Sequence, residues 1–390
     1  MSHRSKFIVV VATLSIAVSA FVCANREPSA TASSAAMVNA KNNHPGPSQF
    51  YAQHNLVSDV AGLADHTDSN VVNAWGLDAG PTTPWWFSDA DTGKTTLYNV
   101  STGSITTFTV PGAGGAQGSP TGLVFNGGAG FVINNGVGTS AARFIFSEED
   151  GTIAAFRGNP IITVVPNANA PAHGAIYKGL AIDSRTAGTH LYATDFHNGK
   201  IDVFDTSFHL ITLAGNFTDP NLPAGFAPFG IQNILGTLYV TYALQDEDAE
   251  DDVAGPGNGF VDAYDLSGNL IGRVASAGEL NSPWGLALAP DDFGRFSGDL
   301  LVGNFGDGRI HAFDPTRLTA SGEFEAVGLL HSAAGKPIQI DGLWSLQFGH
   351  GTASTSANGL TNTLFFTAGP DDESHGLFGT IVVTEPPGRQ

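Results

Sequence analysis

The chain is short of cysteine, of basic residues and of charge in general. Its 390 residues include a single cysteine and 16 Lys+Arg, and charged residues make up 13% of the total, roughly half the usual share. Against 36 Asp+Glu the formal net charge is −20, with a pI near 4.7. Nucleic-acid backbones are neutralised by Lys and Arg. The composition therefore excludes a DNA- or RNA-binding protein and argues against binding to an anionic membrane surface.

The N-terminus has the layout of a secretory signal peptide. Arg4 and Lys6 precede an apolar run over residues 7–22, which is short for a membrane span and is followed by small and polar residues. We expect a signal peptide over residues 1–24, cleaved after Ala24. The mature chain is then secreted or periplasmic. No later apolar stretch approaches 18 residues, so we expect no membrane span in it.

Cys23 lies at the expected cleavage junction and leaves one alternative open, a lipid anchor. Residues 20–22 (Ala-Phe-Val) match the Leu-small-small pattern of lipoprotein processing poorly, so ordinary cleavage is the preferred interpretation. Cleavage would leave no cysteine, which excludes disulfides, thiolate metal sites and a cysteine nucleophile. Residues 25–48 are rich in Ala, Ser, Asn and Pro without any period, and they predict a disordered leader.

One sequence pattern recurs along the rest of the chain. It consists of an aromatic or small residue, Gly and an apolar strand, followed by two more strands that often end in Asp. The clearest copy spans residues 179–183, 191–195 and 200–205. The strands alternate with period 2, which favours strands over helical repeats. The copies start at Gly76, Gly122, Gly179, Gly230, Gly285 and, with Ser in place of Gly, Ser345. Six strand-like copies, each about 45–60 residues long, are typical of a propeller.

We therefore predict an all-β fold, a six-bladed β-propeller over residues 49–385 with a short tail at 386–390. The sixth copy supplies only three strands, while residues 50–58 read as a strand that precedes the first copy. We expect this N-terminal strand to complete the last blade and remove an exposed edge. Asn198-Gly199 and Asp307-Gly308 are strong hairpin-turn signals between the second and third strands of their blades.

The copy at residues 179–205 resembles an NHL repeat. Residues 50–385 as a whole are similar to a family of secreted bacterial propellers, most clearly at 251–262 and 340–349. This resemblance implies a fold and almost nothing about activity. Gluconolactonase-type propellers resemble the chain by fold only. Their inner strands carry an Asn before one Gly-Leu, and no Asn occupies those positions here, so no catalytic residue is carried over.

Two sets of positions should face the central channel on one side of the ring. The residues before the Gly are Trp75, Thr121, Lys178, Phe229, Trp284 and Trp344. The residues that end the second strands are Asp89, Asn134, Asp195, Tyr242, Asn304 and, less clearly, Gly369. Two interpretations stay open. The aromatic residues pack between blades while the carboxylates cap turns, or together they form a pocket for a sugar or another partly apolar solute.

From these positions we select the candidate site residues. The candidate ligand-binding residues are Trp75, Lys178, Asp195, Phe229, Tyr242, Trp284, Asn304 and Trp344. A hard cation is a further hypothesis, because carboxylate and amide oxygens are its ligands. Its candidate ligands are Asp89, Asn134, Asp195, Asn304 and the acidic-loop residues Asp246, Asp248, Asp251 and Asp252. The loop lacks the Gly and Glu of an EF-hand, so it is either a calcium-stabilised loop or a solvated acidic one.

Three functions remain open at this point. The first is a secreted binding or scaffold module that recognises a small solute, a glycan or a protein through a Trp-rich channel face. The second is a metal-dependent hydrolase or lactonase at the channel mouth. The third is a surface or matrix protein without a small-molecule site. The sequence contains no His-Glu-x-x-His, Gly-x-Ser-x-Gly or phosphate-loop motif, so it names no catalytic residue.

Overall fold

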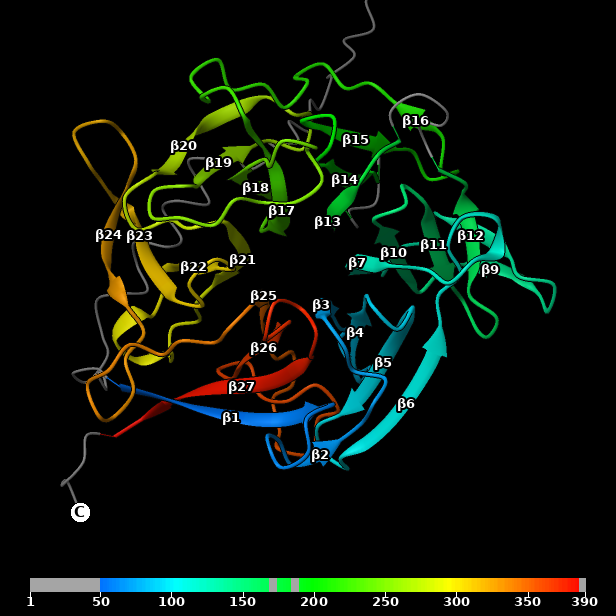
Figure 1. The fold of residues 1–390 in the computed structure, drawn as a ribbon, viewed down its shortest axis with the longest axis horizontal. Helices are drawn as coiled ribbons and strands as arrows, with labels where there is room; N and C mark the ends of the chain where they lie inside the picture. Colours follow the sequence, from blue (N-terminus) through cyan, green and yellow to red (C-terminus); the bar gives the residue numbers. More distant parts are fainter. Residues whose placement is uncertain (1–49, 168–173, 184–188, 386–390) are drawn as a thin grey trace, which may run out of the picture.

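The computed structural model describes residues 50–167, 174–183 and 189–385, and these residues form six sheets around one axis (Figure 1). The predicted all-β, six-bladed propeller is confirmed. The signal peptide, leader and tail predicted at 1–24, 25–48 and 386–390 lie outside the described residues. Across the described ranges, no helix is long and apolar enough to cross a membrane.

Each blade is a sheet that runs outward from the axis, with four strands in blades one to five and five strands in blade six. Blade one contains β3 (Ala74–Asp78), β4 (Trp85–Asp89), β5 (Lys94–Asn99) and β6 (Ser104–Thr109). Blade two contains β7 (Pro120–Phe125), β10 (Phe144–Glu148), β11 (Ile153–Phe156) and β12 (Ile162–Val165). Blade three contains β13 (Tyr177–Ile182), β14 (Leu191–Asp195), β15 (Lys200–Phe204) and β16 (Leu210–Ile211).

The remaining blades follow the same order. Blade four contains β17 (Phe226–Ile234), β18 (Thr237–Leu244), β19 (Phe260–Tyr264) and β20 (Leu270–Ser276). Blade five contains β21 (Pro283–Leu288), β22 (Leu300–Asn304), β23 (Ile310–Leu318) and β24 (Phe324–Leu329). Blade six contains β25 (Leu343–Phe348), β26 (Leu364–Ala368), β27 (Leu377–Thr384) and β1 (Phe50–Ser58), and β2 (His66–Thr67) extends it. Two single 3-10 turns are η2 (Ala113–Gly115) and η3 (Gly294–Phe296).

The ring closes where β1 pairs antiparallel with β27, with Phe50 opposite Thr384. This confirms that the N-terminal strand completes the last blade. Tyr51 anchors the closing strand to blade five, because its hydroxyl donates to the carbonyl of Phe293 at 3.0 Å and its ring is 1% exposed. The strand therefore contributes both hydrogen bonds and a buried side chain to ring closure.

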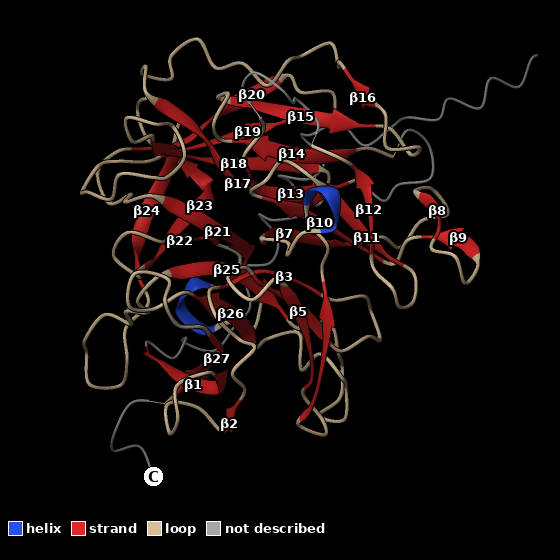
Figure 2. Cartoon of the chain, turned by 45° about the vertical axis from the view of Figure 1, so that its right-hand side comes forward, coloured by secondary structure: helices blue, strands red, loops and turns tan. Residues whose placement is uncertain are grey.

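Blade two differs from the sequence-based prediction. The segment that contains Asn134 forms a separate hairpin, β8 (Val132–Asn134) and β9 (Thr139–Ala141), outside the six blades (Figure 2). The second strand of the blade is β10, which ends at Glu148. The apolar strand at 132–134 looked like the second strand because its pattern is right, but pairing with β9 places it apart from β7.

The repeated Gly is explained by the close approach of neighbouring inner strands. A Cβ on Gly179 would lie 2.8 Å from the carbonyl oxygen of Phe229. At Gly285 the added atom would collide with the carbonyl oxygen of Trp344. Ser345 fits in the sixth blade because its hydroxyl donates to the carbonyl of Trp75 at 2.9 Å. At Gly179 and Gly285 an added Cβ would push the inner strands apart.

The channel inside this ring is built in layers along the axis. The residues that follow the Gly are apolar in every blade and narrow the channel to a throat. They are Leu77, Leu123, Leu180, Ile231, Leu286 and Leu346. The throat encloses only about 10 Å³, space for about one water. The two ends of the channel are therefore separate sites, one where the inner strands begin and one where they end.

Candidate functional site

The end of the channel where the inner strands begin is called here the Lys178 mouth. The residues before the repeated Gly do gather there, as the sequence predicted. Trp75 and Trp344 stack face to face with ring centroids 3.7 Å apart. Phe305 stacks on the other face of Trp344 at 4.0 Å, and Phe229 and Trp284 meet Trp344 edge-on. These aromatic rings form one packed cluster on the axis.

The three tryptophans and Phe229 of this cluster are closed to solvent, and Phe305 is half-buried. Trp75, Phe229 and Trp344 are each 1% exposed and Trp284 is 9% exposed. The indole nitrogen of Trp344 donates to Asn73 at 2.9 Å, and that of Trp284 donates to the carbonyl of Lys178 at 3.1 Å. The tryptophans do not form the exposed pocket wall that one of the two sequence interpretations required. The indoles fill the channel, which is the packing interpretation of these positions.

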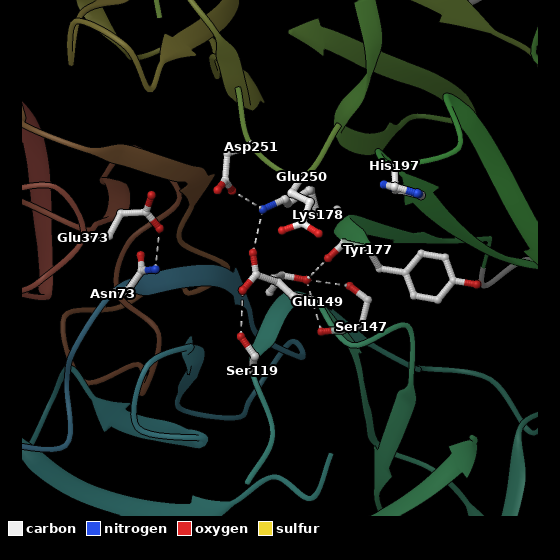
Figure 3. A network of polar contacts seen from close by, with 12 residues as sticks. Asn73, Ser119, Ser147, Glu149, Tyr177, Lys178, His197, Glu250, Asp251 and Glu373 are labelled. Atoms are coloured by element: carbon white, nitrogen blue, oxygen red, sulfur yellow. Dashed lines mark hydrogen bonds and ion pairs between the residues drawn. The ribbon is translucent and has the colours of Figure 1, made fainter. Parts of the chain in front are cut away.

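Lys178 occupies the centre of this mouth, with its side chain 3% exposed. Its ammonium bonds Glu149 from blade two at 2.6 Å and Asp251 from the blade-four acidic loop at 2.9 Å (Figure 3). It also lies 5.3 Å from the centroid of the Trp75 ring. Burial lowers the pKa of Lys178, but the two carboxylates more than offset it, so the pKa is raised and the side chain stays charged.

Two further carboxyl groups around this mouth, Glu373 and Asp252, are half-buried and have raised pKa values. Glu373 bonds the amide of Asn73 at 2.6 Å (Figure 3). Burial raises the pKa of Glu373 to about 7, and the charges of Glu149 and Asp251 add to the rise. Burial likewise raises the pKa of Asp252 to about 6. Several carboxyl groups therefore share one ammonium, and the local excess of negative charge is reduced by protonation.

The side chains that end the second strands mostly form hydrogen bonds with the turns and loops beside them. Asp195 accepts from the backbone of Ile176 and Asn198 and from the Asn198 amide at 2.8 Å. The Asn304 amide donates to the carbonyl of Glu279 and to Asp307. Tyr242 points into its blade, where its hydroxyl meets that of Tyr264 at 2.7 Å. These positions are held by turn and core contacts.

Of the remaining positions predicted to end the second strands, one is confirmed by the strand register and two are shifted. Asp89 is fully buried, accepts from the Thr96 hydroxyl at 2.7 Å, and burial raises its pKa well above the ordinary value. Register places Glu148 opposite Pro120 as Asp89 lies opposite Ala74, so Glu148 takes the place assigned to Asn134. The same register places Ala368 at the position assigned to Gly369.

The proposed cation ligands are not brought together. Asp89, Asn134, Asp195 and Asn304 belong to different blades or, for Asn134, to the outer hairpin. In the acidic loop, Asp246 accepts from the backbone of Glu250, whereas Asp251 turns to Lys178. Within the described ranges, no group of three or more His, Cys, Asp or Glu is placed to hold a metal ion. The metal-dependent hydrolase and the calcium-stabilised loop therefore stay predictions from the sequence.

The other end of the channel, where the inner strands finish, is open and is called here the Asp78 hollow. It has a volume of about 530 Å³, within the usual range for small-molecule sites. Its floor is the apolar throat at Leu77 and Leu123, and Val124 and Ala181 extend the apolar wall. Its polar side chains come from four blades and are Asp78, Asp183, Gln232, Asn233, Gln347 and His350.

Asp78 is the most firmly held of these groups. Its carboxylate accepts from the backbone amides of Ala79 at 2.7 Å and Phe125 at 2.6 Å, and from the Gln347 amide at 3.0 Å. Burial raises its pKa, and these hydrogen bonds act in the opposite direction. The bond to Phe125 crosses from blade one to blade two. Asp78 therefore fixes the rim of the hollow as well as adding polarity to it.

Sequence reasoning missed the Asp78 hollow, although the repeat contains its signal. Asp78, Gln232 and Gln347 each lie two residues after the repeated Gly or its Ser counterpart. Apolar residues occupy that position in the other blades, at Val124, Ala181 and Ala287. A polar side chain in a strand position that is elsewhere apolar marks a departure from the packing rule.

Comparison with known proteins identifies relatives by sequence. The chain is 34% identical over 340 residues to uncharacterized protein R648 of Acanthamoeba polyphaga mimivirus, covering 84% of this chain and 78% of that protein. It is 31% identical over 341 residues to uncharacterized protein L690 of the same virus, covering 84% of each. The chain belongs to the family of these mimivirus proteins. No family model matches the sequence.

Solved structures show the same fold at low sequence identity. A Bacteroides thetaiotaomicron protein of unknown function has a TM-score of 0.50 at 14% identity, covering 85% of this chain and 76% of that one. The virginiamycin B lyase of Staphylococcus aureus has a TM-score of 0.45 at 15% identity, covering 86% and 100%. The likeness to the Bacteroides protein supports the propeller fold alone. The known relatives in sequence are viral, so bacterial origin and the NHL-like repeat stay predictions.

Proposed function

We propose that this protein is a secreted or periplasmic solute-binding propeller whose ligand occupies the Asp78 hollow. The observation that carries the proposal is the hollow itself. It is an open space of about 530 Å³ with an apolar floor and polar side chains from four blades. A concave, partly apolar space with a few convergent polar groups is the usual form of a small-molecule site.

The proposal moves the binding site predicted from the sequence to the opposite end of the channel. At the Lys178 mouth, Trp75 and Trp344 are buried and Lys178 is already paired. A ligand there would have to displace a stacked aromatic cluster or separate the buried Lys178 ammonium from its two carboxylate partners. At the Asp78 hollow no such rearrangement is needed. Export of the protein is inferred from the signal-peptide pattern of residues 1–24 and stays a prediction from the sequence.

Ligand-observed NMR with a library of small neutral metabolites tests this function. Wild-type protein is compared with Gln232→Trp, whose indole would fill the hollow from β17. We expect a subset of the library to bind wild type and to lose binding in the variant, with both proteins showing the same circular dichroism spectrum. The proposal fails if no compound binds wild type, or if every binding compound binds the filled variant equally.

A further inference from the structure

Gln232 has an unusual position between the Asp78 hollow and the throat. Three residues line both spaces, Leu77, Leu123 and Gln232, and only Gln232 is polar. It lies on β17, two residues after Gly230. The corresponding residue of the neighbouring blade, Ala181, has no polar side chain. Of the two amides at this repeat position, Gln232 and Gln347, only Gln232 lines the throat.

The side-chain amide of Gln232 has no hydrogen-bond partner within the described residues, whereas the side-chain amides of Asn233 and Gln347 are both bonded. Gln347 donates to Asp78 at 3.0 Å. Asn233 donates to the carbonyl of Ile182 at 2.9 Å and accepts from the amide of Gly236 at 3.0 Å. A side-chain amide offers two donor hydrogens and an acceptor oxygen. Gln232 is therefore the group at the base of the hollow that is available to a ligand.

The charge of the hollow is one-sided. Two carboxylates, Asp78 and Asp183, line it, while none of its described lining residues is a Lys or Arg. An anionic solute would approach carboxylates without a fixed cation to pair with, and the whole chain carries a formal charge of −20. A cationic head at Gln232 would be desolvated against Leu77 and Leu123, which is costly. The Asp78 carboxylate already accepts three hydrogen bonds from the protein, so it compensates this cost poorly.

Resting on the function proposed above, we propose that Gln232 sets the ligand class of the hollow. The ligand is a neutral solute with an apolar body and an amide or hydroxyl head. The body covers Leu77, Leu123 and Val124, and the head exchanges hydrogen bonds with the Gln232 amide. A neutral head both donates to and accepts from that amide without leaving a buried charge.

Three probes with one apolar body and different heads test the selectivity: cyclohexanecarboxamide, cyclohexanecarboxylate and cyclohexylmethylammonium. We expect saturation-transfer NMR of wild type to detect the carboxamide most strongly, the ammonium more weakly and the carboxylate not at all. In Gln232→Leu we expect about a tenfold loss of carboxamide affinity, the scale of one lost hydrogen bond. The same substitution at an exposed site outside the hollow, Gln339→Leu, should change nothing.

A second variant keeps the test independent of folding defects. Gln232→Glu should lose the carboxamide and gain the ammonium, because it adds a carboxylate where the head lies. The inference is overturned if the carboxylate binds wild type as well as the carboxamide does, if neither Gln232 variant changes the order of the probes, or if no probe binds. The two proposals can fail separately. If metabolites bind wild type but not Gln232→Trp, while the order of the three probes is the same in all Gln232 variants, the hollow binds solutes and Gln232 does not select them.

Discussion

At the scale of single residues, the contacts of Lys178 show that it stabilises the Lys178 mouth. Its position before Gly179 made it a candidate ligand-binding residue. In the structure its ammonium is paired with Glu149 and Asp251 and almost completely buried. Removing a buried partner of this kind leaves unpaired charge and destabilises the fold. The structure therefore indicates that Lys178 joins blades two, three and four.

Glu373 provides a residue-scale prediction for pH. Burial raises its pKa from 4.5 to about 7 in the folded chain. The folded state then binds this proton more tightly than the unfolded state, so the free energy of unfolding falls as pH rises from 4.5 to 7 and the contribution levels off above that. We expect Glu373→Gln to flatten this decline, as measured by urea unfolding across the pH range.

The control is Glu247→Gln, which removes the same charge from an exposed position of the acidic loop. It should leave the slope as in wild type. An unchanged slope in Glu373→Gln would show that the carboxyl group of Glu373 titrates near its ordinary value.

At the scale of elements, the inner strands depend on glycine for close approach. The repeated glycines correctly marked the inner strand of each blade in the sequence. The structure supplies the reason, since a carbonyl oxygen of the neighbouring inner strand lies close to where a Cβ would be. The second strands show where this reasoning failed. Residues 132–134 have the right apolar pattern, yet the blade uses β10, because register is decided by long-range pairing that a local pattern does not contain.

Gly285→Ala tests the close approach of the inner strands. We expect it to lower the free energy of unfolding by about 2 kcal/mol or more, because its new Cβ collides with the backbone of β25. Gly272→Ala is the matched control within β20, since nothing lies within 4 Å of its added Cβ. That variant should be neutral or slightly stabilising. Equal effects of the two substitutions in urea unfolding would contradict this account.

At the scale of the whole molecule, six inner strands enclose a channel that is plugged at one end and hollow at the other. All five tryptophans are buried, namely Trp75, Trp85, Trp86, Trp284 and Trp344. The plug is a hydrophobic cluster of its own, in which the aromatic rings pack with Ala90, Ala227 and Ala243. The open end, in contrast, has loops and polar side chains around it.

Tryptophan fluorescence distinguishes the two descriptions of the Lys178 mouth. We expect native emission to be blue-shifted relative to the unfolded chain and acrylamide to quench it weakly, because the indoles lie away from solvent. An exposed binding platform would instead give strong quenching of the native protein. Unfolding in urea provides the reference for full exposure within the same experiment.

The sequence by itself determined the fold, the blade number and the closure by residues 50–58, because each blade repeats the same strand pattern and glycine spacing. It also determined which residues gather at the start of the inner strands. Only the tertiary structure decided which mouth is open, since that depends on how six different side chains at equivalent positions fill one shared axis. Trp75 and Trp344 stack and close one end, whereas Asp78, Gln232 and Gln347 leave a polar hollow at the other.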